Sequence, residues 1–350
     1  MFTSVFKYAY PHAKVRAMKA MLLSEEHFHG LLTAETFDQL LHVLQATPYG
    51  NTLQDVPSAE LTTSRLTALL YKSLFHDYRK TIRSMPNALQ SVFILYYQRY
   101  ELINLKTILR GMISHVPPET TADLLLPTED YTVFSKSRLL DCHDVRDVIE
   151  ELRGTLFDYP LQLALRRYDQ EQEFFPLEMA LDIHYYHTLW DAFKKLPNDE
   201  EIIVKELIGI VFDILNIAWI IRFKEQYHFS TEEIMNYTIQ HGYAFRLAER
   251  RCLSEAQDMT ELLAYLRTTP YGRTLPEHVS LQTLHVLLNR LLIKHIRKFF
   301  SGDPFQIGVI FGYCLLKEFE IADILTIAEA KKYGFSLEQS QQYIIHTKAF

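Results

Sequence analysis

One short stretch of the sequence carries side chains of the kind that bind metal ions. His184 and His187 are three residues apart, and Glu178 and Asp182 precede them by one or two helical turns. Imidazole and carboxylate groups on one side of a helix are ligands that zinc accepts. The same spacing is common among polar residues on ordinary helix surfaces. We favour the surface interpretation and predict no metal site.

A second set of candidates is a polar pair that recurs three times along the chain. Paired carboxylates can act as a general acid and a general base. Asparagine replaces one carboxylate in two of the three copies, which favours hydrogen bonding between helices over catalysis. The pairs are Glu101 with Asn104, Asp213 with Asn216, and Glu320 with Asp323.

Two arginines follow these pairs at a fixed distance. Arg110 and Arg222 each lie nine residues after the acid of their copy, whereas Glu329 takes this place in the third copy. A guanidinium group here could bind a phosphate or a carboxylate of a partner. Pairing with an acid of the same chain is the alternative that we favour.

The motifs that usually mark an enzyme are missing from the sequence. It contains no G-x-G-x-x-G, no G-x-x-x-x-G-K, no G-x-S-x-G and no H-E-x-x-H. These motifs are the common signatures of nucleotide binding, esterase-type catalysis and zinc proteolysis, and their absence is evidence against an enzyme. We therefore predict a non-catalytic protein with no catalytic residue, no cofactor and no small-molecule substrate.

The most informative feature of the sequence is an internal repeat. Residues 37–53 align with residues 259–275, and nine of the seventeen positions are identical. A weaker copy between them, residues 145–161, lacks the Thr-Pro-Tyr-Gly form that the other two share. The aromatic residues Tyr49, Phe157 and Tyr271 occupy the same register in the three copies.

The recurring polar pair gives an independent measure of the same period. Its copies are 112 and 107 residues apart, whereas those of the first motif are 108 and 114 residues apart. Two motifs with one period predict three bundles of about 110 residues each. We expect helical repeats at residues 1–118, 119–228 and 229–350.

The composition and the periodicity predict that these repeats are helical. Glycine and proline are few, 11 and 13 residues, and apolar residues between positions 281 and 299 recur at helical spacing. Ser24 and Ser230 precede acidic residues and are expected to be helix N-caps. The Thr-Pro-Tyr-Gly motif predicts helix exits, with glycine in a left-handed turn. The expected fold class is all-α.

Charge and hydropathy exclude several classes of protein. The net charge of −7 gives the whole molecule no electrostatic attraction to nucleic acid. The longest nearly apolar stretch, residues 207–221, is too short and too polar to cross a bilayer. Three widely separated cysteines fit neither a disulfide framework nor a zinc site, which indicates a reducing compartment and favours the cytoplasm.

The basic residues are concentrated in the first and third copies. Residues 65–99 contain six basic residues and one acid, and residues 278–302 contain four basic residues and no acid. The middle copy has the opposite bias, with 11 acids and four arginines between residues 141 and 182. A solvated helix face explains any such run, but uneven charge over copies of one repeat indicates partner surfaces. The candidate contacts are Arg79, Lys80, Arg83, Arg290, Lys294, Arg297 and Lys298.

Four segments together resemble a known family over essentially the whole chain. They are residues 8–23, residues 44–50, residues 177–186 and residues 315–320. In this order, and with the internal repeat, the chain resembles the C subunits of the prokaryotic V/A-type rotary ATPases. Their counterparts in the eukaryotic V-type enzymes are the d subunits.

The resemblance implies a fold and a function. It implies an all-helical funnel of three similar bundles about a pseudo-threefold axis, without an active site. Such a protein lies peripherally on the cytoplasmic face of the membrane, on the rotor ring, and receives the end of the central stalk, built from subunits of the D and F type. It passes torque for ion transport and could also contact anionic lipid headgroups. The alternative is a helical-repeat scaffold or regulator unrelated to rotary motors.

Overall fold

The computed structural model describes residues 2–54, 56–57, 61–273, 275–277 and 279–346. These residues form α-helices and connections, and no β-strand occurs among them, so the predicted all-α class is confirmed. The chain divides into two compact units, Pro86–Lys195 and Met1–Met85 together with Leu196–Phe350. The sequence repeat predicts different boundaries, at 118/119 and 228/229. Compactness does not test that division, which stays a prediction.

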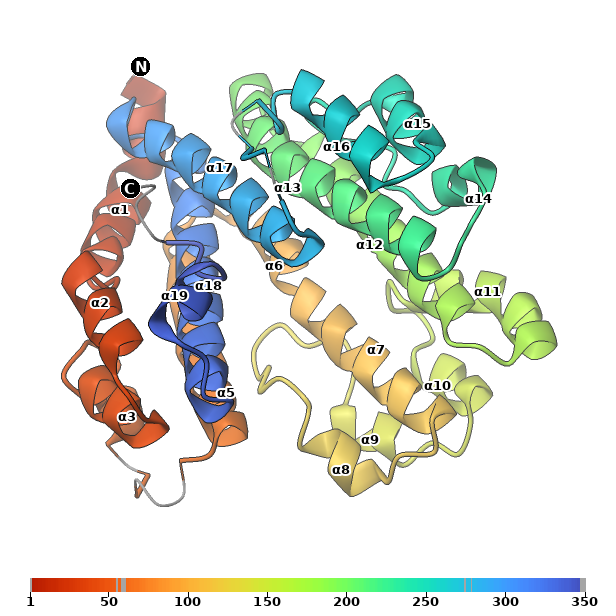
Figure 1. The fold of residues 1–350 in the computed structure, drawn as a ribbon, viewed down its shortest axis with the longest axis horizontal. Helices are drawn as coiled ribbons and strands as arrows, with labels where there is room; N and C mark the ends of the chain where they lie inside the picture. Colours follow the sequence, from red (N-terminus) through yellow and green to blue (C-terminus); the bar gives the residue numbers. More distant parts are fainter. Residues whose placement is uncertain (1, 55, 58–60, 274, 278, 347–350) are drawn as a thin grey trace. The chain divides into compact units, whose positions relative to one another are not determined.

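The larger unit joins both ends of the chain. The long C-terminal helix α18 packs against α1, α5 and the shorter α2 and α3, so segments from opposite ends of the sequence lie side by side (Figure 1). Helix α13 packs against both α17 and α18. The helices of this unit are α1 (Phe2–Lys19), α2 (Glu25–Thr33), α3 (Phe37–Gln45), α4 (Gly50–Leu53), α5 (Thr63–Ser84), α13 (Asn198–Glu225), α14 (Thr231–Asn236), α15 (Leu247–Glu255), α16 (Met259–Thr268), α17 (Leu281–Ser301), α18 (Ile307–Lys332) and α19 (Leu337–Gln341).

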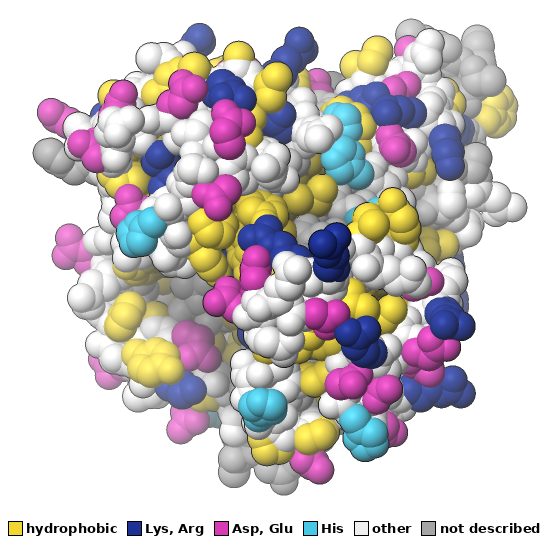
Figure 2. Space-filling model, turned by 90° about the vertical axis from the view of Figure 1, so that its right-hand side faces the viewer, with side chains coloured by type: hydrophobic (Ala, Val, Ile, Leu, Met, Phe, Trp, Pro, Cys, Tyr) yellow, Lys and Arg dark blue, Asp and Glu magenta, His cyan; other side chains and the backbone are white. Residues whose placement is uncertain are grey.

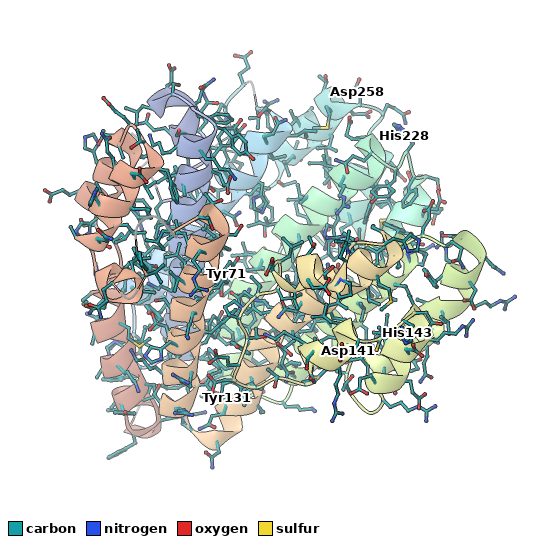
Figure 3. All side chains as sticks on the ribbon, turned by 90° about the horizontal axis from the view of Figure 1, so that it is seen from below. Tyr71, Tyr131, Asp141, His143, His228 and Asp258 are labelled. Carbon is teal, nitrogen blue, oxygen red and sulfur yellow. The ribbon has the colours of Figure 1, made fainter. Side chains whose placement is uncertain are left out.

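The smaller unit is a continuous segment. Helices α11 and α12 pack along each other, and α12 also contacts α6 and α7. Its helices are α6 (Asn87–Tyr97), α7 (Arg99–Ile113), α8 (Pro118–Ala122), α9 (Lys136–Leu140), α10 (Val145–Glu151), α11 (Asp158–Glu171) and α12 (Phe175–Phe193). In Figure 3 the labelled Asp141 and His143 of this unit, like His228 and Asp258 of the larger unit, lie on connections between helices.

Local sequence signals place the helix ends where they are expected. The side chain of Ser24 accepts a hydrogen bond from the backbone N–H of His27, and that of Ser230 accepts one from Glu233. In both cases the third residue of the helix bonds back to the N-cap, which makes a reciprocal capping box. Both predicted N-caps are confirmed.

The Thr-Pro-Tyr-Gly motif ends helices as predicted, but its glycine has another purpose. Helices α3 and α16 end just before it. The positive-φ glycines among the described residues lie elsewhere, so the predicted left-handed turn is wrong. A Cβ atom on Gly50 would lie 2.2 Å from the carbonyl oxygen of Gln45, and one on Gly272 would lie 2.1 Å from that of Leu266. Glycine is needed here because the backbone passes too close to the end of the preceding helix for any side chain.

The second residue of each recurring polar pair holds a later loop onto its long helix. Asn104 accepts from the N–H of Leu126 at 2.7 Å and donates to its carbonyl at 3.0 Å. Asn216 makes the same two contacts with Ile239, at 2.8 and 2.9 Å. The side-chain amide thus satisfies a backbone donor and a backbone acceptor at once, as a neighbouring strand would.

In the third copy an aspartate, Asp323, takes the place of the asparagine and also holds a later loop. Asp323 accepts from the N–H groups of Ile345 and His346 at 2.7 and 2.8 Å, so two donors replace the donor and acceptor of the other copies. The change from asparagine to aspartate therefore matches the backbone groups that each loop presents.

Replacing Asn216 with alanine should destabilise the protein by about 2–4 kcal/mol, because a buried backbone N–H loses its acceptor and a small cavity is left. Urea denaturation followed by circular dichroism measures the free energy of unfolding. The matched control is Asn236→Ala at an exposed position, where we expect a change below about 0.5 kcal/mol. Equal losses in the two variants would contradict the bridging role of Asn216.

Candidate functional site

The predicted basic contacts of the first copy lie on α5. Arg83 is exposed, while Arg79 and Lys80 are partly buried. Nη2 of Arg79 lies 2.8 Å from Nδ1 of His76, and Nζ of Lys80 lies 3.9 Å from a carboxylate oxygen of Asp77. Two of the three cations are therefore engaged with neighbours on their own helix, and Arg83 is the most open to a partner.

The predicted basic contacts of the third copy lie on α17 and fall into two groups. Arg290 is partly buried and donates to the backbone carbonyl oxygens of Ile344, at 2.6 Å, and Gln341, at 3.2 Å. It therefore fixes the segment after α18 rather than presenting its charge. The other three candidates are exposed, and no hydrogen bond or ion pair within the described residues holds their side chains. These three, Lys294, Arg297 and Lys298, are named here the α17 cations.

Basic side chains do not form one large area on the face shown in Figure 2. Lys and Arg residues there alternate with Asp and Glu residues and with small apolar patches.

The two carboxylates among the metal candidates, Glu178 and Asp182, are buried and pair with cations of the same unit, so the predicted surface position is wrong for them. Nζ of Lys106 lies 2.9 and 2.8 Å from the two carboxylate oxygens of Asp182 and 3.3 Å from Glu178. Arg110 approaches Glu178 at 3.2 Å, so the favoured pairing of this arginine within the chain is what the structure shows. Burial raises the pKa of Asp182, and Lys106 acts in the opposite direction. Burial also lowers the pKa of His184.

The ammonium group of Lys106 stands where a cation between these carboxylates would stand. Within the ranges that the structure describes, no group of three or more His, Cys, Asp or Glu side chains is arranged to hold a metal ion.

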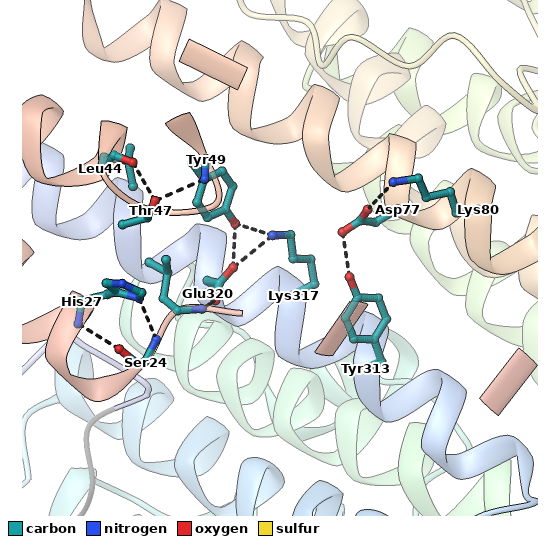
Figure 4. Close-up of polar contacts among 11 residues, drawn as sticks. Ser24, His27, Leu44, Thr47, Tyr49, Asp77, Lys80, Tyr313, Lys317 and Glu320 are labelled. Atoms are coloured by element: carbon teal, nitrogen blue, oxygen red, sulfur yellow. Dashed lines mark hydrogen bonds and ion pairs between the residues drawn. The ribbon is translucent and has the colours of Figure 1, made fainter. Parts of the chain in front are cut away.

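The most developed polar cluster joins the two ends of the chain and is shown in Figure 4. The Tyr49 hydroxyl donates to Glu320 at 2.7 Å, and Lys317 donates to Tyr49 at 2.7 Å and to Glu320 at 3.0 Å. The second carboxylate oxygen of Glu320 accepts from the N–H of Leu23. Tyr49, Lys317 and Glu320 are all buried. Burial raises the pKa of Tyr49, so its hydroxyl keeps its proton and remains a donor.

Two more contacts attach the same helix to α5. The hydroxyl of Tyr313 donates to Asp77 at 2.7 Å, and the hydroxyl of Tyr78 donates to Glu318 (Figure 4 shows the first). Helix α18 is thus joined by charged hydrogen bonds to the turn after α3, to the residue before the N-cap of α2 and to α5. Charge-assisted hydrogen bonds are stronger than neutral ones, which makes this a firm connection.

The same kind of contact joins a tyrosine of the third copy to the acid of the second. The Tyr271 hydroxyl donates to Asp213 at 2.5 Å. The same carboxylate oxygen accepts the backbone N–H groups of Tyr243, Ala244 and Phe245. Burial raises the pKa of Asp213, and these four hydrogen bonds act in the opposite direction.

The acid of the first copy, Glu101, is the one that lacks a tyrosine partner among the described residues. Phe157, in the second copy, occupies the register of Tyr49 and Tyr271, and the buried Glu101 has no tyrosine donor within the described structure. Burial raises the pKa of Glu101, which the nearby Thr128 and Lys136 partly offset.

The sequence analysis identified the tyrosine and the acid of this contact as parts of two recurring motifs. It did not predict that the two side chains are in contact. The partners are 58 residues apart in one case and 271 in the other. The available signal was that tyrosine and acid recur with one period.

None of these clusters combines a nucleophile with a base in an open site, and their geometry fits a role in holding helices together.

The comparison with known families decides the identity. The family model described as ATP synthase (C/AC39) subunit matches residues 11–343. The chain belongs to this family.

Relatives of the C/AC39 family from archaea are similar over nearly the full chain. The C subunit of the A-type ATP synthase of Methanosphaera stadtmanae is 26% identical, over 96% of this chain and 86% of the relative. Its equivalent from Methanocaldococcus jannaschii is 25% identical, over 99% and 88% of the two chains. That of Archaeoglobus fulgidus is 26% identical, over 99% of each.

Membership confirms the resemblance read from the sequence. The protein is a subunit of an ion-transporting rotary ATPase complex, a structural subunit rather than the catalytic one, and its partners are other subunits of that complex. This argues against the alternative of a scaffold unrelated to rotary motors. In the part of the chain that the structure describes, no helix is both long and apolar enough to cross a membrane.

Replacing Tyr271 with phenylalanine should lower the free energy of unfolding by about 1–3 kcal/mol, because the buried Asp213 loses a donor. The converse change, Phe157→Tyr, should raise it by about 1 kcal/mol by giving Glu101 the donor that the other copies possess. Urea denaturation measures both. Tyr333→Phe, at an exposed position, is the control and should have little effect. A loss of stability in Phe157→Tyr as large as that in Tyr271→Phe would contradict the equivalence of the copies.

The buried Glu101 should make stability depend on pH. Its pKa is higher in the folded than in the unfolded chain, so the folded state binds the proton more tightly and stability falls as pH rises above the ordinary glutamate value. Glu101→Gln removes this dependence. The difference in melting temperature, variant minus wild type, should be near zero at pH 4 and positive at pH 8. Glu119→Gln at an exposed position is the control; the same trend in both variants would refute the assignment.

Proposed function

We propose that the protein is the adaptor that links the membrane rotor ring to the central stalk and passes torque between them. The ring and stalk subunits of the D and F type are its partners, and it lies peripherally on the cytoplasmic face of the membrane. Family membership supports this role, since the relatives are C subunits of A-type ATP synthases.

The observation that carries the mechanical part of the proposal is the cluster around Glu320. A part that transmits torque must resist deformation, and α18 is tied to both α5 and the turn after α3 through buried, charged hydrogen bonds. Removing one member of a buried charged pair typically costs about 3–5 kcal/mol. The helices of this unit therefore move together rather than sliding past one another.

The α17 cations supply a surface for the partner contacts. They are exposed, they lie on one helix, and they make no internal ion pair within the described residues. Such charges add little to the stability of an isolated protein, and their natural use is attraction to acidic partner groups. Arg83 on α5 is the corresponding open cation of the first copy.

Reversing the α17 cations to glutamate should weaken assembly with the ring and stalk. Each basic residue near an anionic surface contributes about 1 kcal/mol, so the triple variant should bind roughly a hundredfold more weakly at low salt. The loss should shrink at about 0.5 M salt, because the charges are screened. Reconstitution with purified ring and stalk at the two salt concentrations measures it. Melting temperature, and ATP hydrolysis by the detached soluble sector, should not change.

A control with the same change in net charge separates a contact from a general charge effect. Arg166, Lys195 and Arg273 are exposed, and no predicted contact involves them. Their reversal to glutamate should leave assembly intact. Equal weakening by both triple variants, or no weakening by either, would remove the α17 contact and leave only a solvated helix face.

A further inference from the structure

Helix α1 presents an apolar face that the rest of the described chain leaves open. Its other face is occupied: Tyr8 and Val15 are buried, and the helix packs against α18 and α5. On the open face Phe6 and Tyr10 are 85% and 65% exposed. These two aromatic residues lie one helical turn apart, so they form a patch rather than single scattered residues.

The exposed residues follow the spacing of a coiled-coil seam. Phe6, Tyr10, Ala13, Ala17 and Ala20 are all exposed and are separated by alternating steps of four and three residues. This is the seven-residue hydrophobic repeat by which one helix packs along another. The seam covers roughly 20 Å of helix at about 1.5 Å per residue.

The charges beside the seam have one sign. Lys14, Arg16 and Lys19 flank it, and residues 1–23 contain no acid. Lys14 and Lys19 lie near aromatic rings, and Arg16 bonds to His12, so no carboxylate of this chain neutralises them in the described structure. Lys7, by contrast, pairs with Glu200 at the junction with α13. A second copy of the helix would bring these cations together, which disfavours self-pairing.

We propose that this face, Phe6, Tyr10, Ala13, Ala17 and Ala20 with the flanking cations, docks an α-helix of another chain that carries a large-residue apolar seam flanked by Asp and Glu. Phe6 and Tyr10 are the anchors, and the alanines leave room for the larger side chains of the partner. An anionic membrane surface fits less well, because three of the five seam positions are alanine and offer little apolar area. This surface is separate from the α17 cations, so the proposal does not depend on their role.

The test uses the full chain in the intact rotary complex. A photoreactive benzoylphenylalanine replaces Tyr10, the complex is irradiated, and the crosslinked peptide is sequenced. We expect a crosslink to a different chain, at a helical segment with apolar residues at heptad spacing and flanking acids. The matched control places the photoreactive residue at His42, an exposed position on α3. A yield no higher than that of the control would overturn the proposal.

Two variants test whether the contact depends on the flanking cations and on the small side chains of the seam. Reversal of Lys14, Arg16 and Lys19 to glutamate should reduce the crosslink yield about tenfold. Ala17→Leu should also reduce it about tenfold, because a larger side chain overfills a close helix contact. Circular dichroism melting confirms that each variant folds. Yields unchanged in both folded variants would refute the acidic partner helix.

Ala17→Leu also distinguishes a membrane from a helix. In flotation with vesicles of phosphatidylcholine and phosphatidylglycerol, a membrane-bound face would bind more strongly after the apolar area is enlarged. Stronger flotation of Ala17→Leu, or photolabelled lipid in place of a peptide, would replace the proposal with membrane binding. A crosslink to a second copy of this chain would also overturn it.

Discussion

A buried carboxylate needs hydrogen-bond donors, and Glu320 obtains them from parts of the chain that are far apart in sequence. Tyr49 donates from the turn after α3, Lys317 from the same helix, and Leu23 from the residue before the N-cap of α2. Without them the charge would remain unpaired in the interior at a cost of several kcal/mol. The N-terminal helices must therefore meet α18 in one register, and the packing of α1 and α5 on α18 follows from it.

The copies solve the same problem with different donors. Asp213 relies on three backbone N–H groups and a tyrosine, whereas Glu320 has one backbone N–H, a tyrosine and the ammonium of Lys317. Ile210 stands at the position that corresponds to Lys317, so the ammonium belongs only to the copy that joins the chain ends. Glu101 has neither tyrosine nor ammonium donor. Repetition of a motif thus preserves the place of a group but not its environment.

The sequence analysis was most accurate for features that are determined by residues close together in the sequence. The helical class, the N-caps at Ser24 and Ser230 and the helix exits before Thr-Pro-Tyr-Gly depend on neighbouring residues and were predicted correctly. The analysis was wrong where a side chain is held by a group that is far away in the sequence. Arg290 is held by backbone carbonyl groups more than 50 residues away. Gly50 is a local exception, because the carbonyl oxygen that leaves no room for a side chain belongs to the nearby Gln45. The candidate cations could be identified by composition, but only the packing separates Arg290 from the α17 cations.

The meeting of the two chain ends has a consequence for the order in which the protein can fold during synthesis. The unit Pro86–Lys195 is continuous and has all of its own residues before the last part of the chain is translated. Helices α1 to α5 leave the ribosome before the others, whereas Glu320 and the rest of α18 are translated much later. Tyr49 and the helix faces that α18 covers therefore stay exposed through most of translation. Exposed apolar surface promotes aggregation, so the N-terminal helices are the segment that we expect a chaperone to protect.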